Sequence, residues 1–189
     1  MIAKGHDIPN VTLVGVVSAD VGIGMPDFRA AERTFQILTQ VAGRAGRGDL
    51  PGMVYMQTIN PDHYAILFAA QQDYAGFFEK ELQFRRFMKY PPFAAMANVL
   101  IRAAKQEDAL RMATDLGHHI TPAPENMRIM GPAEAPVPRL KAEYRYQLLI
   151  KSGSRKDLNG LLRKAQEFAR AQKWSATALV IDVDPLTLL

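Results

Sequence analysis

Between residues 96 and 184 the sequence alternates between strand-like and helix-like apolar patterns, and this alternation constrains the fold more than any other feature. Four segments have the short apolar runs of strands, and two have apolar residues at helical spacing. In chain order they are Met96–Ala103 (strand), Glu107–His119 (helix), Arg128–Met130 (strand), Glu143–Lys151 (strand), Ser154–Gln172 (helix) and Ala178–Asp184 (strand). The order β-α-β-β-α-β is the split-βαβ, or ferredoxin-like, arrangement. We therefore expect residues 94–189 to form an α+β domain, a fold that by itself specifies no function.

The N-terminal part of the chain has a shorter pattern of the same kind. Val11–Ser18 and Gly52–Thr58 are apolar runs typical of strands. Between them, apolar residues recur at helical spacing from Ala30 to about Ala42, and Gly43 ends this pattern. One βαβ-like unit is too small to form a sheet domain. We therefore expect residues 1–72 to be the C-terminal part of a larger α/β domain.

A helical stretch from about His63 to Met88 connects these two parts. Lys89-Tyr-Pro-Pro-Phe93 ends it, because proline disfavours a helix both at its own position and at the residue before it. We therefore expect residues 73–93 to be a helical connector, with the domain boundary near the prolines.

Composition excludes several classes of protein. The 189 residues include no cysteine, which excludes a disulfide-stapled secreted scaffold and any thiolate zinc or iron–sulfur site. The four histidines form no HExxH motif, so we expect no metal site. There is no apolar run long enough to span a membrane and no signal-peptide pattern at the N-terminus. We therefore expect a soluble protein of a reducing compartment, located in the cytoplasm, with no membrane partner.

Positive charge is concentrated in the C-terminal part. The formal net charge is +4, but residues 1–75 hold five basic and seven acidic side chains, whereas residues 76–189 hold eighteen and twelve. Such an excess suggests a polyanionic partner for residues 76–189, although many solvated surfaces carry a similar excess.

The most specific motif is the string from Gln40 to Gly48, QVAGRAGRG. On a helix, Gln40 and Arg44 are i,i+4 neighbours and Arg44 and Arg47 are i,i+3 neighbours, so all three can project in one direction. Two guanidinium groups on one face suit the oxygens of a polyphosphate, and across a cleft they can act as arginine fingers. The alternative is a helix ended by glycine with two surface arginines.

A second polar motif, Lys4-Gly5-His6-Asp7-Ile8-Pro9, directly precedes the first strand-like run. A Lys–Gly pair in such a loop can hold a phosphate through charge and backbone N–H groups. Asp7 can orient a neighbouring group. The alternative is a polar loop that ends at a proline.

Together these two motifs resemble motifs V and VI of superfamily-two helicases. The longer strings MIAKGHDIPNVTLVGVVSAD and PDFRAAERTFQILTQVAGRAGRG resemble the replication-restart DNA helicases of the primosomal protein N-prime family. The similarity continues through Lys89–Phe93, Arg145–Lys151 and Ile181–Pro185, and so covers essentially the whole chain.

This resemblance implies an α/β fold in which part of a RecA-like helicase lobe is followed by a βαββαβ domain similar to ribosomal protein S10. It also implies an ATP-dependent 3′→5′ DNA helicase that binds forked DNA and starts primosome assembly in replication restart. Helicases of this family carry Walker A and Walker B motifs and a cysteine-rich zinc module, none of which occurs here. The resemblance thus predicts a C-terminal fragment that does not hydrolyse ATP alone. ATP with Mg²⁺, and zinc in the missing module, would belong to the parent protein.

Residue by residue, the resemblance assigns Arg44 and Arg47 to contact with ATP, with Gln40 beside them. Gly5 and Asp7 would couple the nucleotide state to DNA contact. Lys4 and His6 would lie near the DNA backbone. The same family-typical stretch includes Asp20, Arg29 and Arg33, to which the resemblance assigns no specific role. For Arg33 the alternative is a structural ion pair with Asp27.

For the C-terminal domain, the resemblance implies binding of branched DNA. Cations and aromatic rings alternate in this region, at Arg139, Lys141, Tyr144, Arg145 and Tyr146. Cations can neutralise phosphates while an exposed ring stacks on an unpaired base. However, half of the side chains of the strand-like run must face the core, and we expect one of the two tyrosines to be among them.

The family also docks the acidic tail of single-stranded DNA-binding protein, for which Arg155 and Asn159 are candidate contacts, and it associates with other primosome proteins. We expect a monomer. Two rival functions stay open: a stand-alone, non-catalytic nucleic-acid-binding module and, from the C-terminal order alone, an S10-like RNA-binding protein. The second leaves QVAGRAGRG unexplained.

Overall fold

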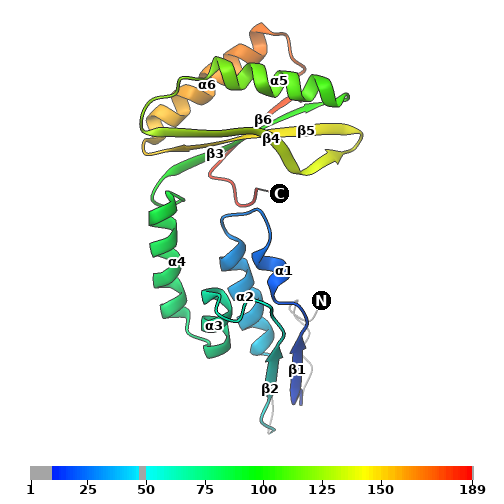
Figure 1. The fold of residues 1–189 in the computed structure, drawn as a ribbon, viewed down its shortest axis with the longest axis vertical. Coiled ribbons are helices and arrows are strands. Elements are labelled where there is room, and N and C mark those ends of the chain that lie inside the picture. The colour runs from blue at the N-terminus through cyan, green and yellow to red at the C-terminus, as the bar shows by residue number, and fades with distance from the viewer. Residues whose placement is uncertain (1–9, 47–49, 189) are drawn as a thin grey trace. The chain divides into compact units, whose positions relative to one another are not determined.

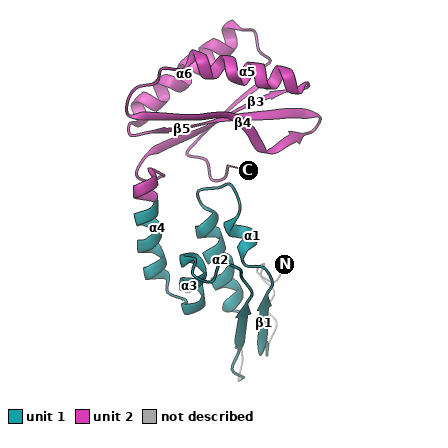
Figure 2. Cartoon of the chain, in the orientation of Figure 1, with its two compact units in different colours: residues 1–84 teal, residues 85–189 magenta. Residues whose placement is uncertain are grey.

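In a computed structural model, which describes residues 10–46 and 50–188, the chain forms two compact units, Met1–Phe84 and Arg85–Leu189 (Figure 2). Helix α4 (Tyr74–Met88) begins in the first unit and ends in the second. The fold is mixed α/β with one sheet in each unit.

The first unit contains a two-stranded parallel sheet. Strand β1 (Leu13–Val16) pairs with β2 (Met53–Met56), and helices α1 (Asp20–Ile23) and α2 (Ala30–Ala42) lie between them in the sequence. The two faces of this sheet differ, because Val14 is buried, whereas its neighbour Leu13 is 62% exposed. Helix α1 is a single short turn of four residues, and its C-cap is Gly24.

The core of the first unit is aromatic and packs between helices. Phe35 of α2 stacks on Phe77 of α4, with the ring centroids 4.0 Å apart. The helical stretch expected from residue 63 to residue 88 contains two helices, α3 (Tyr64–Gln71) and α4. They are separated because Gln72 adopts the left-handed conformation, with φ of 53°, and the Asp73 carboxylate accepts a hydrogen bond from the backbone N–H of Gly76.

The second unit has the order β-α-β-β-α-β that the sequence predicts. Its elements are β3 (Ala95–Ala103), α5 (Gln106–His119), β4 (Met127–Leu140), β5 (Glu143–Ser152), α6 (Arg155–Ala171) and β6 (Leu179–Val183). The sheet order is β4-β5-β3-β6, and all neighbouring strands are antiparallel. Helices α5 and α6 cover one face of this sheet (Figure 1).

Alternation along the strands and helical periodicity on α5 and α6 place the core between the sheet and the two helices. In β3, every second side chain from Ala97 to Ile101 is fully buried. These side chains pack against an apolar group from β5, α5 and α6: Leu148, Ile150, Leu116, Leu158, Leu161 and Leu162. Burial of each leucine contributes about 1.5–3 kcal/mol to stability, so α6 is held chiefly by its leucine face.

Strand β4 is much longer than expected. The sequence predicts a strand only at Arg128–Met130, but β4 runs from Met127 to Leu140 and includes three prolines, Pro132, Pro136 and Pro138. The expectation was wrong because β4 is an edge strand. On its outer side an edge strand has no neighbouring strand, so a proline, which lacks an N–H group, breaks no hydrogen bond there. Irregular register between Met130 and Ala133, and between Glu134 and Arg139, accommodates the prolines.

Candidate nucleotide and nucleic-acid sites

The first candidate site lies where α2 ends. Gln40 is exposed on the last turn of the helix, and Arg44 is half-buried in the turn that follows. That turn has the narrower hydrogen-bond pattern of a 3₁₀ helix, because the backbone N–H of Arg44 donates to the carbonyl oxygen of Val41, three residues earlier, at 3.0 Å. Gln40 and Arg44 therefore both lie at this end of α2. Arg47, the second candidate finger, lies outside the described residues.

The turn that carries Arg44 packs closely against the start of β2. Gly46 has a φ of +73°, and its N–H donates to the carbonyl oxygen of Val11 at 2.9 Å. A Cβ atom on Gly52 would lie 2.1 Å from the backbone nitrogen of Gly46. The two glycines thus allow a backbone contact that fixes the Arg44 turn beside the strands. The motif with Lys4, Gly5, His6 and Asp7 lies outside the described residues.

Asp20, to which the sequence assigned no role, is the centre of a hydrogen-bond network. Its carboxylate accepts from the Thr58 hydroxyl at 2.8 Å, from the Asn60 amide at 2.9 Å and from the backbone N–H of Ile59 at 3.0 Å. Desolvation raises the pKa of Asp20, but these hydrogen bonds outweigh it and lower the pKa to about 2. Asp20 therefore fixes the segment that follows β2.

The alternative given for Arg33 is confirmed. Its guanidinium forms an ion pair of 2.9 Å with Asp27, whose side chain is buried. The same carboxylate accepts a hydrogen bond from the backbone N–H of Arg29 at 2.9 Å. This arrangement stabilises the entry into α2.

The hairpin formed by β4 and β5 divides the C-terminal candidate residues between two faces. Arg139 and Tyr144 are paired in register, and the Arg139 guanidinium lies 5.1 Å from the centroid of the Tyr144 ring. Lys141 is exposed in the two-residue turn, with φ of 50°. Arg145 is next to Tyr144 and so points to the opposite face of the sheet, where it donates a 3.4 Å hydrogen bond to the carbonyl oxygen of Val137. Arg139, Lys141 and Tyr144 thus lie together, whereas Arg145 lies on the opposite face of the hairpin.

Both tyrosines of this strand contribute to packing. Tyr146 is buried, and Tyr144 is partly buried against the core. The Tyr144 ring therefore has an Arg139 contact and a core contact, which leaves only part of it available to a base.

The start of α6 presents the other two candidate contacts. The Ser154 hydroxyl caps the helix by accepting from the backbone N–H of Asp157 at 3.2 Å. Arg155 and Asn159 are exposed one turn apart, and Arg155 forms an ion pair of 2.6 Å with Asp184. A carboxylate partner would therefore compete with Asp184 for this guanidinium.

A further group of cations lies on α6, and no sequence motif gave them a role. Lys156, Arg163 and Arg170 are exposed and follow one another at intervals of seven residues. That spacing, two helical turns, is the signal by which the sequence could have revealed them.

Within residues 10–46 and 50–188, no group of three or more His, Asp or Glu side chains could hold a metal ion. Across the same ranges, every helix is too short or too polar to cross a lipid bilayer.

Comparison with known proteins decides the family. The model of the primosomal protein N C-terminal domain matches residues 86–186, which is more than half of the chain. The chain belongs to this family. The family expected from the sequence is thus confirmed, and the primosomal protein N C-terminal domain coincides closely with the βαββαβ unit.

Several curated proteins match all or nearly all of the chain. The replication restart protein PriA of Bacillus subtilis is 41% identical over 191 residues, covering 100% of this chain and 24% of the relative. The protein of the same name from Rickettsia conorii is 39% identical, over 98% of this chain and 28% of the relative. That from Haemophilus influenzae is 39% identical, over 100% and 26%. The chain thus spans about a quarter of the length of these relatives.

Proposed function

We propose that this chain is the C-terminal part of an ATP-dependent 3′→5′ DNA helicase that binds forked DNA and starts primosome assembly in replication restart. The observation that carries this proposal is the match of the whole chain, at 37–41% identity, to several proteins named replication restart protein PriA. A cytoplasmic location and a monomeric state accompany the proposal.

The first unit would be the end of the second RecA-like lobe. Its parallel strands joined through a helix are the βαβ arrangement that such a lobe requires. In this role Arg44 and Arg47 would contact the phosphates of ATP, with Gln40 beside them and Mg²⁺ bound by the other lobe. ATP would supply the energy of translocation. Gly5 and Asp7 would couple the nucleotide state to DNA contact, and Lys4 and His6 would contact the DNA backbone. A zinc module would lie elsewhere in the parent protein.

The arginine assignment can be tested in the full helicase. Arg44→Ala and Arg47→Ala are each expected to reduce ATP-driven fork unwinding by 10³-fold or more, as loss of an arginine finger does, while the Kd for forked DNA changes little. Arg111→Ala is the matched control, because Arg111 is an exposed arginine that is already paired with Asp108. Unwinding at the wild-type rate by both variants would refute the assignment.

The second unit would supply contacts to DNA and to proteins. The cations Arg139 and Lys141 would contact phosphates near the hairpin turn, with Tyr144 beside them, and Arg145 would contribute from the other face. Arg155 and Asn159 would bind the acidic tail of single-stranded DNA-binding protein.

Salt-dependent binding of forked DNA by residues 1–189 tests the DNA contacts. Reversal of Arg139, Lys141 and Arg145 to Glu is expected to abolish the salt-dependent binding that these cations provide. If the variant bound as tightly as the wild type, the hairpin would have no role in DNA binding.

A second candidate, a non-catalytic nucleic-acid-binding module, is favoured by the exposed cations of the hairpin. It predicts that the chain accounts for all of the DNA affinity of its parent protein and that Arg44→Ala leaves the parent's activity unchanged. The unwinding assay therefore separates the two candidates.

A further inference from the structure

Helix α6 has one apolar face and one strongly basic face. The apolar face, with Leu158, Leu161, Leu162 and Ala165, packs into the core. The opposite face is exposed. We define the α6 basic face by its exposed residues Lys156, Asn159, Gly160, Arg163, Glu167, Arg170 and Lys173, the last of which lies two residues beyond the end of the helix.

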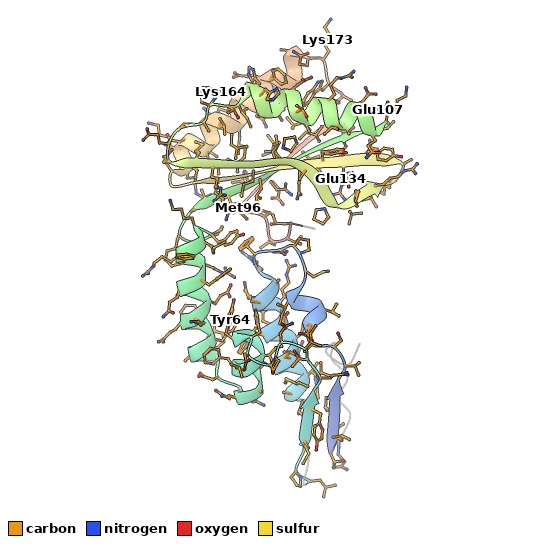
Figure 3. All side chains as sticks on the ribbon, in the orientation of Figure 1. Tyr64, Met96, Glu107, Glu134, Lys164 and Lys173 are labelled. Atoms are coloured by element: carbon orange, nitrogen blue, oxygen red, sulfur yellow. The ribbon has the colours of Figure 1, made fainter. Side chains whose placement is uncertain are left out.

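The cations of this face are available to a ligand. Within the described residues, no carboxylate forms an ion pair with Lys156, Arg163, Arg170 or Lys173. The nearest carboxylate in the sequence to Lys156, that of Asp157, accepts a hydrogen bond from the Asn126 amide at 2.8 Å. Lys164 and Lys173 project from the outer side of the helical layer (Figure 3).

Three of these cations form a straight row. Lys156, Arg163 and Arg170 recur every seven residues, and because α-helices rise 1.5 Å per residue, they are spaced by about 10 Å along the helix axis. Each step of seven residues rotates the side chain by only about 20°. The row therefore places three positive charges along about 21 Å of the helix, with one exposed carboxylate, that of Glu167, between Arg163 and Arg170.

Gly160 lies within the row, between Lys156 and Arg163. A Cβ atom at Gly160 would meet no atom within 4 Å, so the packing of the chain does not require a glycine there. Glycine inside a helix is unfavourable relative to alanine. Because Gly160 has no side chain, a ligand can approach the helix backbone closely between Lys156 and Arg163.

We propose that the α6 basic face binds the sugar–phosphate backbone of double-stranded nucleic acid. Charge complementarity selects a polyanion, and a rigid row of cations suits the regular phosphates of a duplex. The face also lacks an exposed aromatic ring, because Phe168, the aromatic residue of α6, stacks on His119 and contacts the edge of Trp174. Without a stacking platform, binding of unpaired bases is disfavoured. This surface goes beyond the hairpin contacts of the proposed function, because it lies on another element.

The experiment measures binding of residues 1–189 to a blunt 20-base-pair DNA duplex over a series of salt concentrations. The test variant is Lys156→Gln/Arg163→Gln/Arg170→Gln, because glutamine retains the helix propensity of the residues it replaces. Loss of three phosphate contacts is expected to weaken binding by roughly tenfold or more and to reduce the slope of log K against log salt by about 3.

The matched control is Lys80→Gln/Lys105→Gln/Arg128→Gln, which changes the net charge equally at three exposed positions of other elements. It is expected to retain most of the salt slope. Equal losses in the two triple variants would mean that net charge alone matters and would overturn the proposal. Failure of the folded wild-type chain to bind the duplex would overturn it as well.

The hairpin variant with Arg139, Lys141 and Arg145 changed to Glu separates this inference from the proposed function. If the α6 variant binds like the wild type while the hairpin variant loses forked DNA, the inference fails and the hairpin assignment stands. Preferential binding of a single strand over the duplex, lost in the α6 variant, would overturn the choice of a duplex.

Discussion

Arg155 and Asp184 form an ion pair of 2.6 Å that links the first turn of α6 to the residue that follows β6. The Asp184 carboxylate also accepts a hydrogen bond from the backbone N–H of Met96, on β3, through its other oxygen at 3.2 Å. One carboxylate thus joins two strands to a helix, while it occupies the guanidinium proposed to bind an acidic peptide.

Asp184→Asn separates these two interactions, because asparagine keeps an oxygen for Met96 but loses the charge. Arg155 is 65% exposed, so loss of the ion pair is expected to lower the free energy of unfolding by at most about 1 kcal/mol. Release of Arg155 should strengthen binding of an acidic peptide with a free C-terminal carboxylate, measured by fluorescence anisotropy. Arg155→Ala should weaken it. Equal effects of the two variants on peptide affinity would contradict this competition.

The Asp20 network predicts a dependence of stability on pH. Because the pKa of Asp20 in the folded protein is about 2, below its ordinary value of 3.8, the carboxylate stabilises the fold above pH 3.8. This contribution is lost as the pH falls from 3.8 through 2. Urea unfolding of Asp20→Asn should therefore show a smaller decrease in stability over this range than the wild type. Glu79→Gln, at an exposed position on α4, is the control and should behave like the wild type.

Features set by local sequence were predictable, and features set by distant neighbours were not. Apolar residues at helical spacing predicted a helix over Ser154–Gln172, which differs from α6 by one residue at each end, because this pattern acts inside one helix. The extent of β4 was missed, because whether a strand tolerates proline depends on its place in the sheet. The role of Asp20 was missed for the same reason, since Thr58 is 38 residues away in the sequence.

The division of the hairpin cations between two faces shows how far site prediction could go. Alternation in a strand makes it certain that neighbours such as Tyr144 and Arg145 point in opposite directions. The partner of each side chain, however, follows from the strand register, which pairs Arg139 with Tyr144. That register includes two irregular positions in β4, and proline and glycine content alone does not fix them.

Gly131 makes one of these irregularities. Its φ is +107°, and a Cβ atom there would lie 2.6 Å from the carbonyl oxygen of Gln147 on β5. Gly131→Ala is therefore expected to lower the free energy of unfolding by about 2–3 kcal/mol, through backbone strain and the close contact. Gly153→Ala is the control, because its Cβ would meet its nearest neighbour at 3.9 Å. Chemical denaturation of both variants measures the difference, and equal stabilities would refute the account of β4.

Gly160 allows stability and nucleic-acid binding to be separated on α6. Gly160→Ala should raise the free energy of unfolding by about 1 kcal/mol, because alanine favours the helix and meets open space. The added methyl group should nevertheless weaken duplex binding, since it obstructs the approach of the backbone between Lys156 and Arg163. Gly117→Ala in α5 is a matched control: its Cβ would lie 3.8 Å from Leu148 in the core, so it should increase stability without changing duplex affinity. If Gly160→Ala stabilised the protein and left the Kd for the duplex unchanged, phosphates would not approach α6 at this point, and the basic face would act through its long side chains alone.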